Sequence, residues 1–209
     1  MNGRLNLAIW VIVLGGGAAL LLHLYVIEIW TLPVNDPLLA ASVAPTLHEG
    51  DLLVLMRETS IERGQLVRCK DPTSSDRFVV GRAMARSGET VDIGLELVSV
   101  DRRRAPSPRG CDRAKVFDPT RNEEIDLDCS VEEYAGRDYN ALRSRAFPEP
   151  PRTFTVEFGK WFLVSDDRHV HLDSRDFGPI DASSCQHIAV RLVGAGGFSD
   201  ADSRFTFVW

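Results

Sequence analysis

The stretch that decides the fold reads ASVAPTLHEGDLLVLMR and covers residues 41–57. It joins a loop of small residues to a turn at Glu49-Gly50, and then to an apolar run, Leu52 to Leu55, that predicts a strand. Ser42 lies in the loop, and three interpretations of it are open at this point. It is a turn residue, part of a small-x-small signal-peptide cleavage site, or a nucleophile.

The N-terminal segment from Leu5 to Ile27 is almost wholly apolar. At about 1.5 Å per residue it is long enough to span the hydrocarbon core of a bilayer. Arg4 precedes it and no Lys or Arg follows before Arg57, so residues 1–4 are expected in the cytoplasm and the rest of the chain outside. A cleaved signal peptide is the alternative, but its apolar core would be shorter. We therefore expect a single-pass transmembrane anchor at residues 5–27, contact with the lipid bilayer, and a main domain on the outer, periplasmic side of the cytoplasmic membrane.

The composition is that of an ordinary globular chain. It has 209 residues, of which 26% are charged, and a net charge of -6. This length predicts one domain with a decorating subdomain. Nucleic-acid binders usually present a basic surface, so no nucleic-acid partner is expected. Lysine is scarce and occurs only as Lys70, Lys115 and Lys160.

Short runs rich in β-branched residues, separated by turn signals, predict a mainly-β fold. Such runs lie at residues 52–55, 65–69, 77–84, 91–93, 97–100, 154–156, 161–164 and 187–193. Between residues 101 and 152 the composition changes to Arg, Pro, Asp and Glu, which predicts a surface cap insert outside the core. The β core is therefore expected from residues 28–100 and 153–209.

The four cysteines are Cys69, Cys111, Cys129 and Cys185. None has the paired spacing of a metal site, so no metal is expected, and no other cofactor. An exported domain permits disulfides, and Cys111 with Cys129 is the favoured pair because both lie in the insert. Four free thiols are the alternative.

A second polar cluster reads SDDRHVHLDSRDFGP and covers residues 165–179. Its side chains include many that can orient a group or exchange a proton. Taken alone, it is better explained as a solvated loop of internal salt bridges.

Taken together, these segments resemble the motifs of bacterial type I signal peptidases, membrane-anchored serine proteases that remove signal peptides. The family's nucleophile motif, Ser-Met-x-Pro-Thr-Leu followed by Gly-Asp, is matched by residues 42–47 and 50–51. Its Arg-Gly-Asp-x-Val motif is matched by residues 63–67, and its Gly-Asp-Asn-Arg-Asp-Asn-Ser-x-Asp-Ser-Arg-x-Trp-Gly motif by residues 165–178. The resemblance covers most of the chain after the apolar segment. It implies an antiparallel β-sheet catalytic core, Ser42 as nucleophile, and signal peptides of exported proteins as substrates.

Two departures from the family concern the base that a serine nucleophile needs. The family uses a Ser-Lys dyad, and its lysine position is Gly81 here, while the serine beside that lysine is His171. In one interpretation, Gly81 leaves space that the imidazole of His171 occupies. Histidine is a competent base near neutral pH. Asp173 or Asp166 would then hold the second nitrogen of the ring. In the others, the site has lost activity or the base lies elsewhere.

A third departure is Ala40, where many family members place a serine that supplies an oxyanion-hole hydroxyl. Ala40 is also expected to contact substrate. Phe78 and Val80 alternate on the strand that ends at Gly81, and they are expected either to line substrate pockets or to belong to the core.

We predict a membrane-anchored serine endopeptidase that cleaves signal peptides. A catalytically inactive paralogue, acting as a binding or accessory module, is the alternative, and a general or dedicated substrate range stays open.

Overall fold

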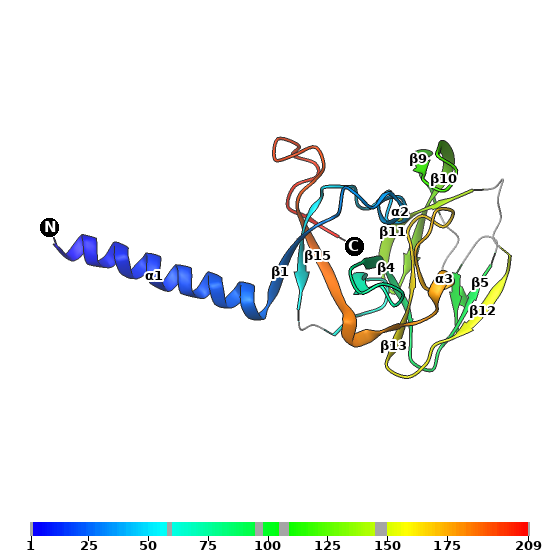
Figure 1. Cartoon of the computed structure of the whole chain (residues 1–209), viewed down its shortest axis with the longest axis horizontal. Helices are drawn as coiled ribbons and strands as arrows, with labels where there is room; N and C mark the ends of the chain where they lie inside the picture. Colours follow the sequence, from blue (N-terminus) through cyan, green and yellow to red (C-terminus); the bar gives the residue numbers. More distant parts are fainter. Residues whose placement is uncertain (1, 58–59, 95–97, 105–108, 145–149, 209) are drawn as a thin grey trace.

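The computed structural model describes residues 2–57, 60–94, 98–104, 109–144 and 150–208. It shows a β domain from which one helix, α1 (Asn2–Tyr25), projects (Figure 1). The predicted mainly-β fold is confirmed, with a curled antiparallel sheet at its centre. Residue 97 of the strand predicted at 97–100 lies outside the described residues.

The main sheet has the strand order β1-β2-β15-β3-β4-β13-β14, with β16 paired to β15. β15 is late in the chain but lies between β2 and β3, which are neighbours in sequence. The strands are β1 (Ile27–Thr31), β2 (Leu52–Met56), β3 (Leu66–Lys70), β4 (Phe78–Arg86), β13 (Lys160–Val164), β14 (Ile180–Asp181), β15 (Cys185–Val193) and β16 (Thr206–Phe207).

Two smaller sheets and three short helical segments complete the domain. One sheet has β5 (Thr90–Ile93), β6 (Val98–Val100), β7 (Arg103–Arg104) and β12 (Arg152–Thr155). The other has β8 (Arg109–Gly110), β9 (Ala114–Asp118), β10 (Glu123–Tyr134) and β11 (Arg137–Arg143). The helical segments are α2 (Pro37–Ser42), α3 (Ser174–Phe177) and the 3-10 turn η1 (Ala182–Ser184).

The insert differs from the purely surface element expected from its composition. Its described residues contribute Val116, Leu127 and Leu142 to a buried cluster that also contains Ala41 of α2 and Val170. Along β9 and β10, buried aliphatic residues alternate with more exposed, mostly charged residues, because successive residues of a strand face opposite sides. The average composition of the insert therefore does not reveal its buried side chains. The insert is therefore packed against the segment that carries Ser42.

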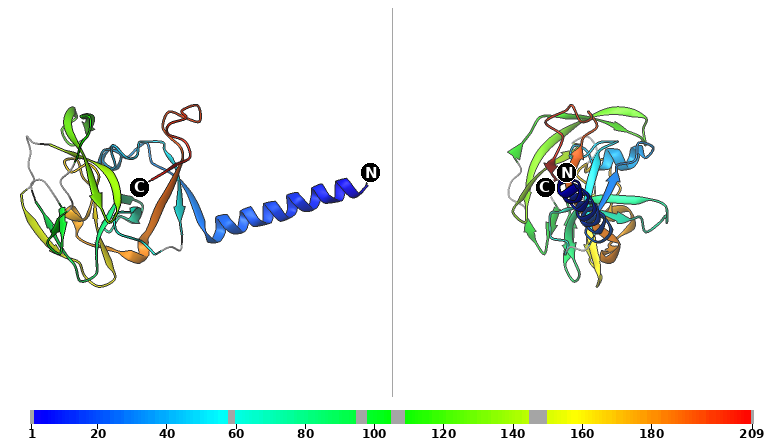
Figure 2. Two further views of the ribbon diagram at one scale, coloured as in Figure 1. Left: turned by 180° about the vertical axis from the view of Figure 1, so that it is seen from behind. Right: turned by 90° about the vertical axis from the view of Figure 1, so that its left-hand side faces the viewer.

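The predicted transmembrane anchor at residues 5–27 is not confirmed. Within the part of the chain that the structure describes, no helix is both long and apolar enough to cross a membrane. Two further views show α1 extending away from the β domain (Figure 2).

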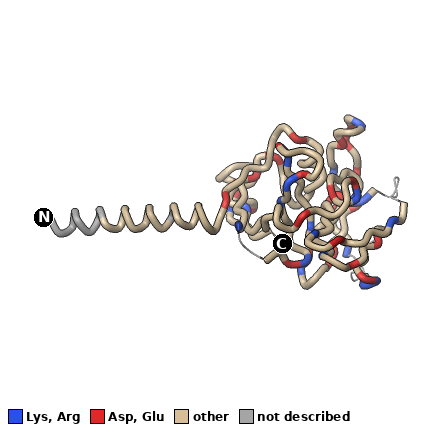
Figure 3. Tube along the Cα trace, turned by 60° about the horizontal axis from the view of Figure 1, so that its bottom comes forward, with Lys and Arg blue, Asp and Glu red and all other residues tan. Residues whose placement is uncertain are grey.

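Charged residues of both signs are spread over the β domain (Figure 3). Many of them pair, as Arg137 does with Glu62 at 2.6 Å.

Two disulfides tie the β domain together. Cys111 is bonded to Cys129, the pair favoured from the sequence, and Cys69 is bonded to Cys185. The second pair joins facing positions of β3 and β15. Its two residues are 116 apart in the sequence, so only the order of strands in the sheet reveals the pairing.

Replacing both cysteines of a pair by alanine is expected to cost more stability for Cys69 and Cys185 than for Cys111 and Cys129. The pairs close loops with sequence separations of 116 and 18. In the chain-entropy model such loops correspond to about 5 and about 3 kcal/mol, respectively. Urea unfolding of the two double variants under non-reducing conditions measures the difference, with reduced wild-type protein as the control. An equal or larger loss in the insert variant contradicts this ranking.

Candidate active site

Ser42 is the last residue of α2. Asp36 caps this helix by accepting a hydrogen bond from the N–H of Leu39 at 3.1 Å, and Pro37 fits the first turn because no N–H donor is needed there. The Ser42 side chain is fully buried and its hydroxyl donates to the carbonyl of Leu39 at 2.8 Å. The serine is thus held at the end of α2 with its hydroxyl turned back along the helix.

The loop after the serine is tied to the rest of the fold at two points. The Thr46 hydroxyl donates to the carboxylate of Asp166. Asp51 is fully buried and its carboxylate lies 3.1 Å from Nε of Arg191 on β15. Gly50 has a φ of 83°, which glycine adopts without strain. These contacts explain why Thr46 and the Gly-Asp pair accompany the serine in the motif.

Arg82 and Asp166 form a fully buried ion pair beside this loop. Nε and Nη2 of Arg82 each donate at 2.9 Å to a different oxygen of Asp166, a bidentate arrangement. The guanidinium carbon also lies 4.6 Å from the ring centroid of Tyr139. Asp166 was one of two carboxylates expected to hold His171, but its oxygens are engaged by Arg82 and Thr46.

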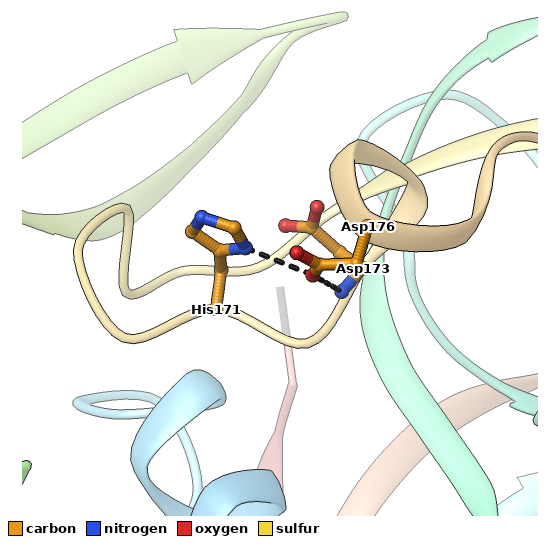
Figure 4. Close-up of side chains that lie close together, drawn as sticks. All are labelled: His171, Asp173 and Asp176. Carbon is orange, nitrogen blue, oxygen red and sulfur yellow. Dashed lines mark hydrogen bonds and ion pairs between the residues drawn. The ribbon is translucent and has the colours of Figure 1, made fainter. Parts of the chain in front are cut away.

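His171 lies in the loop between β13 and α3 and is partly buried. Its Nδ1 is 2.9 Å from Oδ2 of Asp176 (Figure 4). Asp176 also accepts from the N–H of Asp173 at 3.1 Å, which completes a capping box at the start of α3. Among the described residues, Asp176 is therefore a carboxylate in direct contact with the imidazole. It was not predicted, although the Asp-x-x-Asp spacing of a capping box was a signal for it.

Asp173 has a different role from the one expected. Its fully buried carboxylate accepts hydrogen bonds from Arg175 at 2.7 and 2.9 Å. Burial opposes the ionisation of Asp173, but the Arg175 guanidinium outweighs it and holds the pKa of this carboxyl well below its usual range. His171, Asp173 and Asp176 each offer one ligand atom, all within 4.8 Å of one another. Because Arg175 already neutralises the buried carboxylate, the arrangement is better explained as a capped helix with an ion pair than as a metal site.

Asp167 is the functional candidate that sequence reasoning missed. Its N–H donates to the carbonyl of Ser42 at 3.1 Å. Its Oδ1 accepts from the N–H groups of His169 at 2.7 Å and Val170 at 2.9 Å. Its Oδ2 is buried and has no hydrogen-bond partner among the residues that the structure describes. Burial raises the pKa of Asp167 to about 7, against the opposing effect of these hydrogen bonds and of the positive charge of Arg175. In the sequence it looks like the preceding aspartate, and only the fold separates the paired carboxylate from the unpaired one.

Gly81 lies close to β13. A Cβ added to it would be 3.2 Å from the carbonyl oxygen of Val164 and 3.3 Å from Cβ of Leu163. A side chain at the family's lysine position would thus begin in close contact with β13. That His171 fills the space beside Gly81 stays a prediction. The Ser42 hydroxyl donates to the carbonyl of Leu39.

The two residues expected either in substrate pockets or in the core have core-like surroundings. Val80 is fully buried in the cluster that contains Leu39. Phe78 is partly buried, with the guanidinium carbon of Arg68 at 4.3 Å from its ring centroid and the ring of Trp30 at 6.1 Å. These contacts favour a structural role for both.

A groove of about 300 Å³ runs alongside α2. Small side chains form one wall, among them Ala40, which was expected to contact substrate, and Ala44. Residues of β9, including Val116 and Phe117, form the other wall. Residues on both sides of Ser42 in the sequence line the groove, while Ser42 itself is buried and is not among the lining residues.

The comparisons with known proteins agree with this fold and motif order. A family profile described as "Signal peptidase, peptidase S26" matches residues 7–192. The chain therefore belongs to the signal peptidase family. Similar proteins include signal peptidase I of Streptococcus pneumoniae serotype 4 (strain ATCC BAA-334 / TIGR4), 25% identical over 151 residues, which cover 68% of this chain and 72% of the relative. Signal peptidase I of Streptococcus pneumoniae strain ATCC BAA-255 / R6 matches to the same extent.

Replacing Arg82 by alanine is expected to destabilise the fold strongly, because it leaves the carboxylate of Asp166 buried without its partner. The expected cost is about 3–5 kcal/mol, measured by urea unfolding. The matched control is Arg113→Ala, which removes an exposed partner of Asp128 and should change stability by about 0–1 kcal/mol. Similar losses in the two variants would show that the buried pair is not important for stability.

Substituting Gly81 tests the close approach of β13. Gly81→Ala should cost about 1–3 kcal/mol, since Val164 or Leu163 has to shift to admit the methyl group. Gly110→Ala on β8 is the control, because a Cβ there meets nothing within 4 Å. Gly81→Lys should lower the melting temperature further. A Gly81→Lys protein as stable as wild type would mean that this space is open after all.

Proposed function

We propose that this chain is a serine endopeptidase that cleaves signal peptides of exported proteins, with Ser42 as nucleophile and His171 as base. The observation that carries the proposal is the position of the family-motif serine at the end of α2, the helix whose Ala40 and Ala41 line the groove. Membership of the signal peptidase family supports the substrate class.

In the proposed reaction the Ser42 hydroxyl rotates away from Leu39, and His171 takes its proton as Oγ attacks the scissile carbonyl. The bond from Oγ to carbon forms, and His171 returns the proton to the leaving amine when the C–N bond breaks. Water then hydrolyses the acyl-enzyme by the same proton path. Asp176 holds Nδ1 of the imidazole, as the carboxylate does in a catalytic triad.

The disulfides support a proposed place of action. Bonds such as Cys69–Cys185 and Cys111–Cys129 persist in oxidising compartments and are rare in the cytosol. We place the β domain on the outer side of the cytoplasmic membrane, where exported proteins present their signal peptides. Signal peptidases are membrane-associated in general, which supports this location.

A binding or accessory module is the second candidate, and two observations favour it. The Ser42 hydroxyl is buried against the carbonyl of Leu39, and β13 closes on Gly81 where the family has its lysine. Such a module would hold signal-peptide-like segments in the groove without cleaving them.

Cleavage of a fluorogenic signal-peptide substrate by the purified full-length chain separates the candidates. Ser42→Ala and His171→Ala should each lower the rate by about 10²-fold or more, and the double variant should be no worse, because the two residues act as one unit. Asp176→Asn should lower the rate less, since it disturbs only the orientation of the imidazole. Lys70→Ala and Lys160→Ala are the controls and should stay within a few fold of wild type.

The other outcomes are equally informative. Full activity of His171→Ala would place the base elsewhere. If wild type and Ser42→Ala bind the substrate equally and neither cleaves it, the accessory module is the function.

A further inference from the structure

Asp167 is a fully buried residue that links the serine to the loop of His171, and the proposed reaction does not use it. Its N–H holds the carbonyl of Ser42, and its Oδ1 closes the turn that leads through His169 and Val170 to His171. One side chain and one peptide group therefore connect the end of α2 to the loop that carries the imidazole.

Within the described residues, no group donates a hydrogen bond to Oδ2 of Asp167. On the α2 side, Asp167 is hydrogen-bonded to Ser42, which is uncharged. On the β11 side, Asp167 forms an isolated β-bridge with Leu142. Among the nearby charges, Arg175 of α3 is bonded to Asp173, and His171 of the same loop lies against Asp176.

The remaining charged groups of the neighbouring elements have carboxylate partners too. Arg143 of β11 and Arg168 both pair with Glu132, the second at 2.9 Å. Nε2 of His169 lies 3.8 Å from Asp118. An ionised Asp167 would thus place a negative charge in the interior with no donor to Oδ2 from the described part of the chain, which is unfavourable.

We propose that Asp167 is a positioning residue for Ser42 that works in its neutral form. With a proton on its carboxyl group, Asp167 keeps the loop of residues 165–171 seated against the carbonyl of Ser42. Loss of that proton loosens the loop. Only the consequence for peptide cleavage rests on the proposed function; the effect on the fold does not.

The direction of the pH dependence follows from linkage. Burial raises the pKa of Asp167 from the ordinary value of 3.8 to about 7 in the folded protein. Between these values the unfolded chain has released the proton and the folded chain still holds it. The contribution of Asp167 to stability is therefore greatest below the ordinary value and is lost progressively as the pH rises to about 7.

The variant Asp167→Asn tests this in the full-length chain. Asparagine keeps an Oδ1 acceptor for the two N–H groups but cannot ionise. Relative to this variant, wild type should lose several degrees of melting temperature between about pH 5 and about pH 8. The control Asp126→Asn removes an exposed carboxylate of β10 and should give a curve parallel to that of wild type. Parallel curves for Asp167→Asn and wild type overturn the proposal.

A second measurement does not depend on any variant. The carboxyl carbon of Asp167 in ¹³C-labelled wild type should titrate with a midpoint near neutral pH, and protection of its amide from hydrogen exchange should fall over the same range after correction for intrinsic rates. A midpoint in the ordinary range of aspartate overturns the proposal, even if Asp167→Asn fails to fold.

The cleavage assay then shows what the residue does for the serine. The kcat of wild type should decline on the alkaline side with little change in KM, and Asp167→Asn should lack that decline. An identical decline in the variant would refute the positioning role. If no form of the chain cleaves peptide, the proposed function fails, while melting and carboxyl titration still decide whether Asp167 works in its neutral form.

Discussion

The buried pair of Arg82 and Asp166 is the interaction on which the arrangement of the candidate site depends. Arg82 belongs to β4, Asp166 follows β13, and Thr46 brings in the loop after the serine, so one ion pair joins three distant segments. Removing two charges from water costs several kcal/mol per ion, which is offset only by good geometry and additional hydrogen bonds. The bidentate contact and the Thr46 hydroxyl supply both. The pair therefore specifies how these segments meet, whatever chemistry Ser42 performs.

A second buried carboxylate attaches the insert to the same region. Glu132 of β10 lies 2.9 Å from Arg168, which belongs to the last family motif, and it also pairs with Arg143 and accepts from the Tyr139 hydroxyl. Burial opposes the ionisation of Glu132, but the two guanidinium groups outweigh it and lower its pKa. Together with the apolar cluster under α2, this network makes the insert part of the site's support rather than an independent cap.

Local patterns were enough to predict the class of fold and the pairing inside the insert, because strand alternation and turn residues are short-range features. The grouping of Ser42 with the third motif came instead from the family resemblance. The partners of the polar groups were harder to predict because each depends on the packing of distant segments. Asp166, Asp167, Asp173 and Asp176 are chemically alike in the sequence, and the fold gives them four different environments. Cys69 and Cys185 meet only because β15 enters the sheet beside β3.

That position of β15 also sets the order in which the domain can form during synthesis. β2 and β3 are made first, and β15, the strand that bridges them, is made more than 100 residues later. Until residues 185–193 have emerged, the two early strands lack the partner that joins them, and the ladder hydrogen bonds of their facing edges cannot form. Sheets held together by such distant pairings fold slowly, because a long loop must close before any contact rewards it. The central sheet is therefore completed only after residues 185–193 have been made.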